Sequence, residues 1–429
     1  MRMRNLLFGM IIVATAAMTS GNAAAGNSPL DTKAASMSTA DAAQLVALGD
    51  LYLEAMRLDE AKASYKAALK LEAKYGDAEF GLARIDITRG KLEKAKKACR
   101  GVWRRHKDES VGEVCAGWLW LTFDRSARAM DEFQKAIAKG DLARGKTGMA
   151  EAHRRRADDG IAIAEYQEAL TAGAGYVARM GLGLSQESNG DTTAALSSLK
   201  QATVLEPASC LAHFHYARVL GKGAQAVSHM QTAIAIRPNW TEAYVELGEI
   251  LLENVDFAGA KSAFESAIST AKVKSGIAHL GLGKALFGLK KPADSKKELE
   301  AAVELVPNLV DAYLLLADIE YANGNSDASL EALDKAKAMA PGVVRVYLHT
   351  GETYFRLGRY TSANSYLKQA INLKPALSLA HMYLGDIACE RRLYAAGQTH
   401  YNNALKGDMV GLSADSIKKR KAVCKSKHP

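Results

Sequence analysis

The sequence predicts an all-α protein built from stacked helix pairs, an α-solenoid. Prolines recur at a fixed pitch of 34 residues, at Pro307, Pro341 and Pro375, and the side chains between them repeat in the same order. Apolar and small residues follow helical spacing through nearly the whole chain, and no stretch alternates as a strand requires. A period of this length is typical of supersecondary units that each pack on their neighbours.

Each copy of the repeat contains two helical stripes joined by a short turn. In the first copy Leu45, Leu48, Gly49 and Tyr52 fall at i, i+3, i+4 and i+7, on one side of a helix. Residues 61–68 form the second stripe. Eleven such units are predicted within residues 42–410, beginning near Ala42, Gly76, Ser110, Ala143, Tyr176, Cys210, Thr241, Gly276, Val310, Val344 and Ser378.

Two positions of the unit explain how its helices pack. The eighth residue is Gly or Ala, as at Gly49, which lets the second helix approach closely, and the twenty-fourth, as at Tyr65, fills the space between the helices. Prolines such as Pro207 and Pro238 end the second helices of their units. Residues 411–429 are expected to form a capping helix, from Leu412 to Cys424, and a basic tail.

The amino terminus has the pattern of a secretory signal. Arg2 and Arg4 precede an apolar run from Leu6 to Met18, and small residues follow as far as Ala25. We expect a signal peptide at 1–25 and a small, polar linker at 26–41; the alternative is an uncleaved membrane anchor. An exported chain of this kind is expected in the periplasm.

The order of an aromatic residue, a Leu-Gly-like pair, a small residue, a large apolar residue, Ala and Pro resembles the tetratricopeptide repeat, over residues 42 to about 407. The resemblance implies a right-handed superhelix whose first helices line a concave groove. It also implies a binding scaffold for other proteins, without catalytic activity or a cofactor. The Lys and Asn residues with which some members bind a carboxy-terminal carboxylate are absent from the matching positions.

By the same resemblance, positions 2, 5, 9 and 12 of each first helix face the groove. The alternative is that position 5 packs on neighbouring helices and position 9 is an ordinary solvated face. As a set these residues indicate an amphipathic groove for an extended or helical partner segment. The candidate partner-binding residues are Phe80, Arg84, Trp118, Arg154, Met180, Phe214, Arg218, Glu249, Lys284, Asp318, Glu352 and Asp386.

The chain is basic, with 56 Lys and Arg against 47 Asp and Glu, a net charge of +9. Basic residues cluster at 91–105, at 154–156 and at 418–421. These clusters are either solvated faces or contacts with an anionic polymer or membrane surface. Export argues against nucleic acid as the partner.

The five cysteines permit two pairings. Cys99 and Cys115 lie on adjacent antiparallel helices and could form a disulfide, the alternative being two buried thiols. Cys389 and Cys424 are a second, more distant pair. Cys210, His213 and His215 have metal-like spacing, but they do not converge on one point, so no metal site is predicted.

The sequence therefore predicts an exported, non-enzymatic scaffold that organises a multiprotein machine of the cell envelope. Such machines serve polysaccharide secretion, cell-wall assembly, motility or outer-membrane biogenesis. The alternative is an accessory module that binds polysaccharide or an anionic surface through the Trp103–Trp120 region and the basic faces. The identity of the partner and the oligomeric state stay open.

Overall fold

The structure of the chain, a computed structural model, describes residues 28–37 and 41–426. These residues form 24 α-helices and no β-strand, apart from an isolated bridge between Leu377 and Asp408. The predicted signal peptide lies outside the described residues. Within the described ranges, no helix combines the length and the apolar character needed to cross a bilayer.

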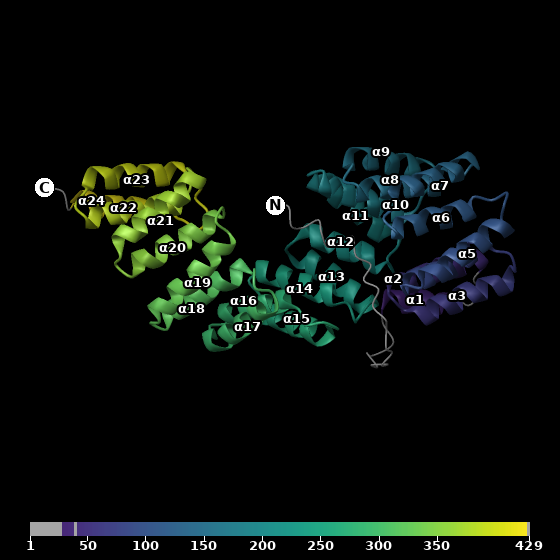
Figure 1. Cartoon of the computed structure of the whole chain (residues 1–429), viewed down its shortest axis with the longest axis horizontal. Coiled ribbons are helices and arrows are strands. Elements are labelled where there is room, and N and C mark those ends of the chain that lie inside the picture. The colour runs from purple at the N-terminus through teal and green to yellow at the C-terminus, as the bar shows by residue number, and fades with distance from the viewer. Residues whose placement is uncertain (1–27, 38–40, 427–429) are drawn as a thin grey trace. The chain divides into compact units, whose positions relative to one another are not determined.

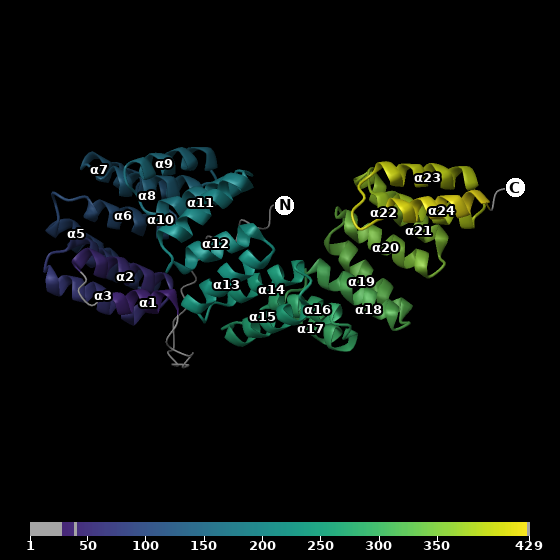
Figure 2. The ribbon, with the colours of Figure 1, turned by 180° about the vertical axis from the view of Figure 1, so that it is seen from behind.

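The chain divides into two compact units, Met1–Asp256 and Phe257–Pro429, with the boundary inside the seventh repeat. Figures 1 and 2 show the helices of each unit stacked in chain order. The helices of unit 1 are α1 Pro29–Ser36, α2 Ala42–Glu54, α3 Leu58–Leu71, α4 Gly76–Thr88, α5 Leu92–Arg105, α6 Val111–Thr122, α7 Ser126–Ala138, α8 Leu142–Arg155, α9 Asp159–Thr171, α10 Tyr176–Ser188, α11 Thr192–Leu205, α12 Cys210–Leu220, α13 Ala224–Ile236 and α14 Thr241–Glu253.

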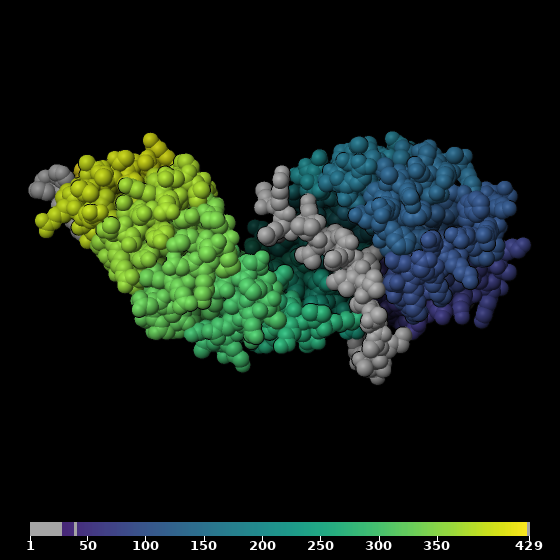
Figure 3. Space-filling view, viewed as in Figure 1, coloured from purple at the N-terminus to yellow at the C-terminus, as the bar shows by residue number. Residues whose placement is uncertain are grey.

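Unit 2 continues the same alternation and ends in an additional helix. On the face seen in Figure 3, its repeats pack side by side from the green helices to the yellow ones. Its helices are α15 Phe257–Thr270, α16 Gly276–Gly288, α17 Pro292–Leu305, α18 Val310–Ala322, α19 Ser326–Met339, α20 Val344–Arg356, α21 Tyr360–Leu373, α22 Ser378–Glu390, α23 Tyr394–Lys406 and α24 Ala414–Ser426.

The even-numbered helices α2 to α22 are the first helices of the repeats, and each begins within one residue of an expected repeat start. In the ten repeats that lie within one unit, the first helix contacts the second helix that follows it. Where a proline closes a repeat it lies two residues beyond the second helix; α11 ends at Leu205 before Pro207, and α19 ends at Met339 before Pro341. Proline cannot supply the N–H that another helical turn would need, so the helix stops there.

Part of the predicted linker at 26–41 is helical, since α1 spans Pro29–Ser36. Ser28 caps this helix by accepting the Asp31 backbone N–H at 3.2 Å, and Pro29 occupies its first turn. Leu30 is fully buried. A segment with one large apolar residue still orders when a cap satisfies its free N–H groups and that residue packs on a neighbouring helix.

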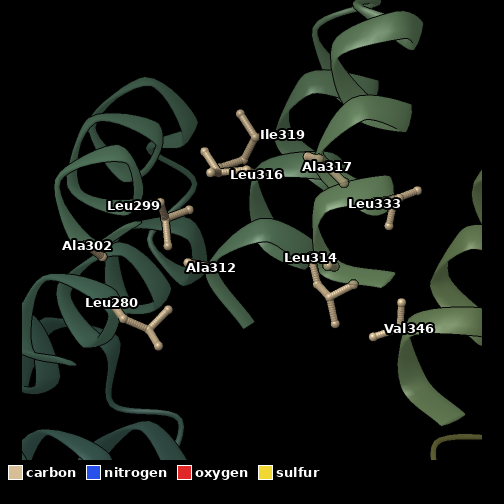
Figure 4. Packing of buried hydrophobic residues seen from close by; sticks show 12 residues of the cluster. Leu280, Leu299, Ala302, Ala312, Leu314, Leu316, Ala317, Ile319, Leu333 and Val346 are labelled. Atoms are coloured by element: carbon tan, nitrogen blue, oxygen red, sulfur yellow. The ribbon is translucent and has the colours of Figure 1, made fainter. Parts of the chain in front are cut away.

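The twenty-fourth residue of each repeat is buried in the core. Figure 4 shows such a core in unit 2, with Leu299 and Leu333 beside apolar side chains of α18. In the first repeat a Cβ on Gly49 would lie 2.6 Å from the ring of Tyr65. A Cβ on Gly81, the sixth residue of the next repeat, would lie 2.4 Å from the same ring.

This second glycine follows a rule within the chain. Wherever another repeat follows an aromatic residue at position 24, position 6 of that next repeat is Gly; elsewhere a larger residue stands there. The aromatic residue occupies the volume that a side chain would otherwise fill. The pairs are Tyr65 with Gly81, Phe133 with Gly148, Tyr166 with Gly181 and Phe264 with Gly281.

Unit 1 closes on itself. Successive first helices contact one another, α2 with α4 and onward to α12 with α14, so they line the inner side of the stack. In addition α2 contacts α12, and α1 contacts α13. The first repeat therefore meets the sixth, and the first helices of unit 1 surround a closed inner face.

Candidate functional site

The twelve predicted partner-binding residues fall in both units. Eight lie on first helices of unit 1 and four on first helices of unit 2, so the inner face of each unit is described by itself. Eleven of the twelve are half-buried, and Phe214 is the exception. Half-burial is suited to a binding residue, because the side chain is held in place and still presents surface.

Phe214 does not contribute to the inner surface as expected. Its side chain is buried, with 6% exposed, and it stacks on Trp240 with ring centroids 4.4 Å apart. Leu280, Leu314 and Met382, at the same fifth position of their repeats, are also buried. In these four repeats the residue at position 5 therefore contributes to helix packing. This agrees with the alternative interpretation, in which position 5 packs on neighbouring helices.

Charged side chains at position 9 form hydrogen bonds and ion pairs with side chains of their own repeat and of the following element. Asp50 accepts the Tyr65 hydroxyl at 2.6 Å and Arg84 of the next repeat at 2.6 Å. In unit 2 Asp386 accepts the Tyr401 hydroxyl at 2.7 Å and also pairs with Arg420, 34 residues further on. A carboxylate thus joins the tyrosine of its own repeat to the arginine of the following element.

A second charged group lies on α8. The Glu151 carboxylate accepts hydrogen bonds from Nε and Nη2 of Arg154, each at 2.8 Å, and from Nε of Arg155 at 2.8 Å. It also accepts the Tyr166 hydroxyl at 3.1 Å. Burial alone would raise the pKa of Glu151, but the two guanidinium groups outweigh it and hold the pKa at about 2. This carboxylate is charged at every physiological pH.

Trp118 stands at the ninth position of the third repeat, where the neighbouring repeats carry charges. Its ring meets Phe133 edge to face, with centroids 5.9 Å apart and planes at 75°. Phe133 is fully buried, whereas Trp118 is half-buried. Trp118 thus packs on the core of unit 1 through Phe133 and remains partly exposed.

Sequence models of the tetratricopeptide repeat match residues 32–116, 280–343 and 344–387. The chain is a tetratricopeptide repeat protein. Helix pairs in a period of 34 residues, small residues at position 8 and prolines after the second helices agree with this assignment. No curated protein matches the chain in sequence.

Solved structures of tetratricopeptide repeat proteins resemble this one at low identity. Yeast Tom70 is 14% identical over 90% of this chain and 96% of that chain, with a TM-score of 0.49. A tetratricopeptide repeat protein from Parabacteroides merdae is 16% identical over 58% and 98% of the two chains, with a TM-score of 0.49. YrrB, described as having an unusual peptide-binding site, is 22% identical over 43% and 96%, with a TM-score of 0.34.

The inner face of this tetratricopeptide repeat protein contains a seam that the sequence did not reveal. At the end of α2, Glu54 Oε1 accepts the Tyr176 hydroxyl at 2.6 Å, and Oε2 accepts the Ser209 hydroxyl at 2.8 Å. Burial raises the pKa of Glu54 to about 7, against the two hydroxyl hydrogen bonds and nearby Arg84, which lower it. No local pattern joins residues so far apart in sequence, so the seam depends on the curvature of the whole unit.

The three residues with metal-like spacing serve packing in this array. Cys210 is a buried free thiol. The Nε2 of His213 lies 3.1 Å from the Pro207 carbonyl, and its Nδ1 lies 2.7 Å from Nδ1 of His229. Burial, with Arg218 and Arg154 nearby, lowers the pKa of His215 to about 3. Among the described residues no three or more His, Cys, Asp or Glu side chains are grouped to hold a metal ion.

Both considered cysteine pairs are joined in the structure. Disulfides link Cys99 to Cys115, and Cys389 to Cys424. The first ties α5 to α6 at the contact between position 24 of one repeat and position 6 of the next. The second fastens α24 to α22, and Ile417 of α24 is fully buried, so α24 covers the last repeat.

Proposed function

We propose that this protein is a non-enzymatic scaffold of the cell envelope that binds segments of partner proteins on the inner faces of its repeats. Tetratricopeptide repeat proteins generally act as protein-interaction scaffolds. The amino-terminal pattern of basic, apolar and small residues supports export, and with it a place among the machines that build or operate the envelope.

The observation that carries the proposal is the setting of Trp118. A half-buried indole, fixed on Phe133 and flanked along the first helices by the Asp50–Arg84 and Glu151–Arg154 pairs, has the features of an interface anchor. Tryptophan and arginine are the residues most enriched among those that dominate binding energy. A partner segment would bring an apolar side chain to Trp118 and polar groups to the ion pairs.

The proposal is tested by capturing partners from envelope fractions with the immobilised chain. We expect Trp118→Ala to lose the captured proteins while its melting temperature stays close to that of the wild type. Trp120→Ala is the matched control: it lies on the same helix, is also half-buried, and contacts Phe123 and Arg128. Equal loss in both variants, or a Trp118→Ala chain that unfolds, would refute a specific role for Trp118.

The proposed location has its own test. After fractionation of the source cells, we expect the protein in the periplasmic fraction with Gly26 as its first residue. A protein that retains residues 1–25 and sediments with the inner membrane would instead support the alternative of an uncleaved anchor.

Polysaccharide binding through the Trp103–Trp120 region is less well supported. A sugar platform needs several exposed aromatic rings in one plane. Of the three indoles in this region, Trp103 is exposed, whereas Trp118 and Trp120 are half-buried. Trp103 also lies on a different helix, α5, so the region does not present several exposed rings.

A further inference from the structure

The outer side of α5 is the most basic helix face of unit 1. Eight of the seventeen residues from Lys91 to Lys107 are Lys or Arg, and Glu93 is the only acidic one among them. The buried side of α5 holds Ala95, Cys99 and Val102. All eight cationic side chains are exposed, and in Figures 1 and 2 α5 lies at the periphery of unit 1.

Most of this charge has no acidic partner. Lys94 pairs with Asp86, and Arg105 pairs with Glu79. The other six cations form no ion pair with any described residue. Four of them follow one another along the exposed side of the helix and, with Trp103, form what we term the basic face: Lys96, Lys97, Arg100, Trp103 and Arg104.

Trp103 is the one large apolar side chain on the basic face, and 46% of it is exposed. Its indole N–H donates to Glu113 Oε1 at 3.0 Å. Glu113 is buried and is also held by the Lys139 ammonium at 2.8 Å. Because the polar N–H is satisfied on the protein side, the exposed part of the indole is its apolar ring.

The basic face is also held rigidly. The Cys99–Cys115 disulfide fastens α5 to α6 on the opposite side of the helix. Gly112 lets the two helices approach closely, since a Cβ there would lie 2.6 Å from Cα of Trp103. The stretch of α5 that carries the cations and the indole is therefore fixed against α6.

We propose that the basic face docks on the surface of an anionic phospholipid bilayer, with the four cations at the headgroup phosphates and Trp103 at the headgroup level. An exposed helix side without a groove suits an extended charged plane better than a peptide segment. Lys and Arg near a bilayer are attracted by anionic lipid, and an amphipathic indole partitions to the membrane interface. This surface is on second helix α5 and is distinct from the inner face proposed for protein partners.

The test is co-sedimentation of the intact chain with vesicles of phosphatidylcholine alone and of phosphatidylcholine mixed with phosphatidylglycerol. We expect binding only to the mixed vesicles, and release by high salt, because the attraction is electrostatic. Replacing Lys97, Arg100 and Arg104 together by Gln should weaken binding by at least about tenfold, since each charge near the surface contributes severalfold. Trp103→Ala should weaken it without altering the salt dependence.

The matched control replaces Lys418, Lys419 and Lys425 by Gln, which removes three charges from exposed side chains of α24. We expect this variant to bind as the wild type does. Equal binding to neutral vesicles, equal loss in the two triple variants, or binding to soluble polyphosphate but not to anionic vesicles would each overturn the proposal. Unchanged melting temperatures identify the loss as one of binding; an α5 triple variant that is folded and still binds fully also overturns it.

Discussion

The carboxylate of Glu54 accepts a hydrogen bond from the Tyr176 hydroxyl at 2.6 Å, although 122 residues separate them. The Ser209 hydroxyl, 155 residues from Glu54, donates to the other carboxylate oxygen at 2.8 Å. One side chain thus joins the first repeat to the fifth and to the start of the sixth. These contacts, with the Lys33–Glu206 ion pair from α1, hold the inner face of unit 1 closed.

The first prediction concerns pH. Burial raises the pKa of Glu54 from an ordinary value of 4.5 to about 7 in the folded chain. The folded state therefore holds this proton more tightly than the unfolded state does. The stabilisation that results is fully present below about pH 4.5 and is lost as the pH rises to about 7, on the order of 3 kcal/mol in total. Denaturant unfolding across this range measures the slope.

Glu54→Gln isolates this contribution. The amide keeps the shape and an acceptor for Tyr176 but cannot ionise, so we expect a smaller loss of stability from pH 4.5 to 7 than in the wild type. Buried histidines with lowered pKa values, such as His215, give the opposite slope in both chains and cancel in the comparison. Glu253→Gln, at the same repeat position but exposed, is the control and should leave the slope unchanged. Identical slopes for Glu54→Gln and wild type would contradict the prediction.

The second prediction concerns α1. Leu30→Ala should lower the free energy of unfolding by about 2–4 kcal/mol, because it removes a fully buried side chain from the contact between the amino terminus and the stack. Hydrogen exchange should also become faster in α2 and α12, which meet at the seam. Leu393→Ala, at a site that is 55% exposed, should change stability little. A Leu30→Ala chain as stable as that control would show that α1 does not support the closure.

The third prediction concerns the pairing of aromatic residues with glycine. A Cβ on Gly181 would lie 2.3 Å from the Tyr166 ring, so Gly181→Ala should destabilise the chain by about 1–3 kcal/mol through overpacking. Gly160→Ala is the control: this helical glycine has open space around its Cβ direction, and alanine there should be neutral or stabilising.

A double variant tests the rule itself. Tyr166→Leu with Gly181→Leu reproduces the pair found at Leu299 and Leu315. We expect it to be more stable than the sum of the two single changes, since the shorter side chain frees the volume that the new one needs. Strict additivity in a double-mutant cycle would argue that the two residues do not share that volume.

The repeats could be read from the sequence because they depend on local rules. The eighth-position glycines, the position-24 core residues and the prolines after second helices all act within a few turns of helix, and the helices begin where these signals place them. By contrast, Leu30 is a single apolar residue in a polar stretch, and nothing nearby indicates that a helix forms there and meets α13.

The candidate site was only partly visible for the same reason. The repeat register predicts which residues stand at positions 5 and 9 of successive first helices, and it places Trp118 and Arg84 at position 9. Whether a residue at one of these positions is exposed depends on its neighbours. Phe214 is buried because Trp240, just before the next repeat, stacks on it. The Glu54 seam depends on the summed curvature of six repeats, which no single repeat encodes.

The last prediction concerns the thiols. The structure has two disulfides and one buried free cysteine, Cys210, among five cysteines. An alkylating reagent should therefore modify no cysteine in the folded chain, one after unfolding without reductant, and five after unfolding with reductant, as counted by mass spectrometry. Reduction should also lower the melting temperature, because opening the 35-residue Cys389–Cys424 loop frees the capping helix α24 and removes a constraint of about 3–4 kcal/mol on the unfolded chain. Cys210→Ser leaves both disulfides intact and serves as the control for thiol loss alone. Three or more modified cysteines in the unfolded, unreduced protein would mean that at least one of the two pairs is not bonded.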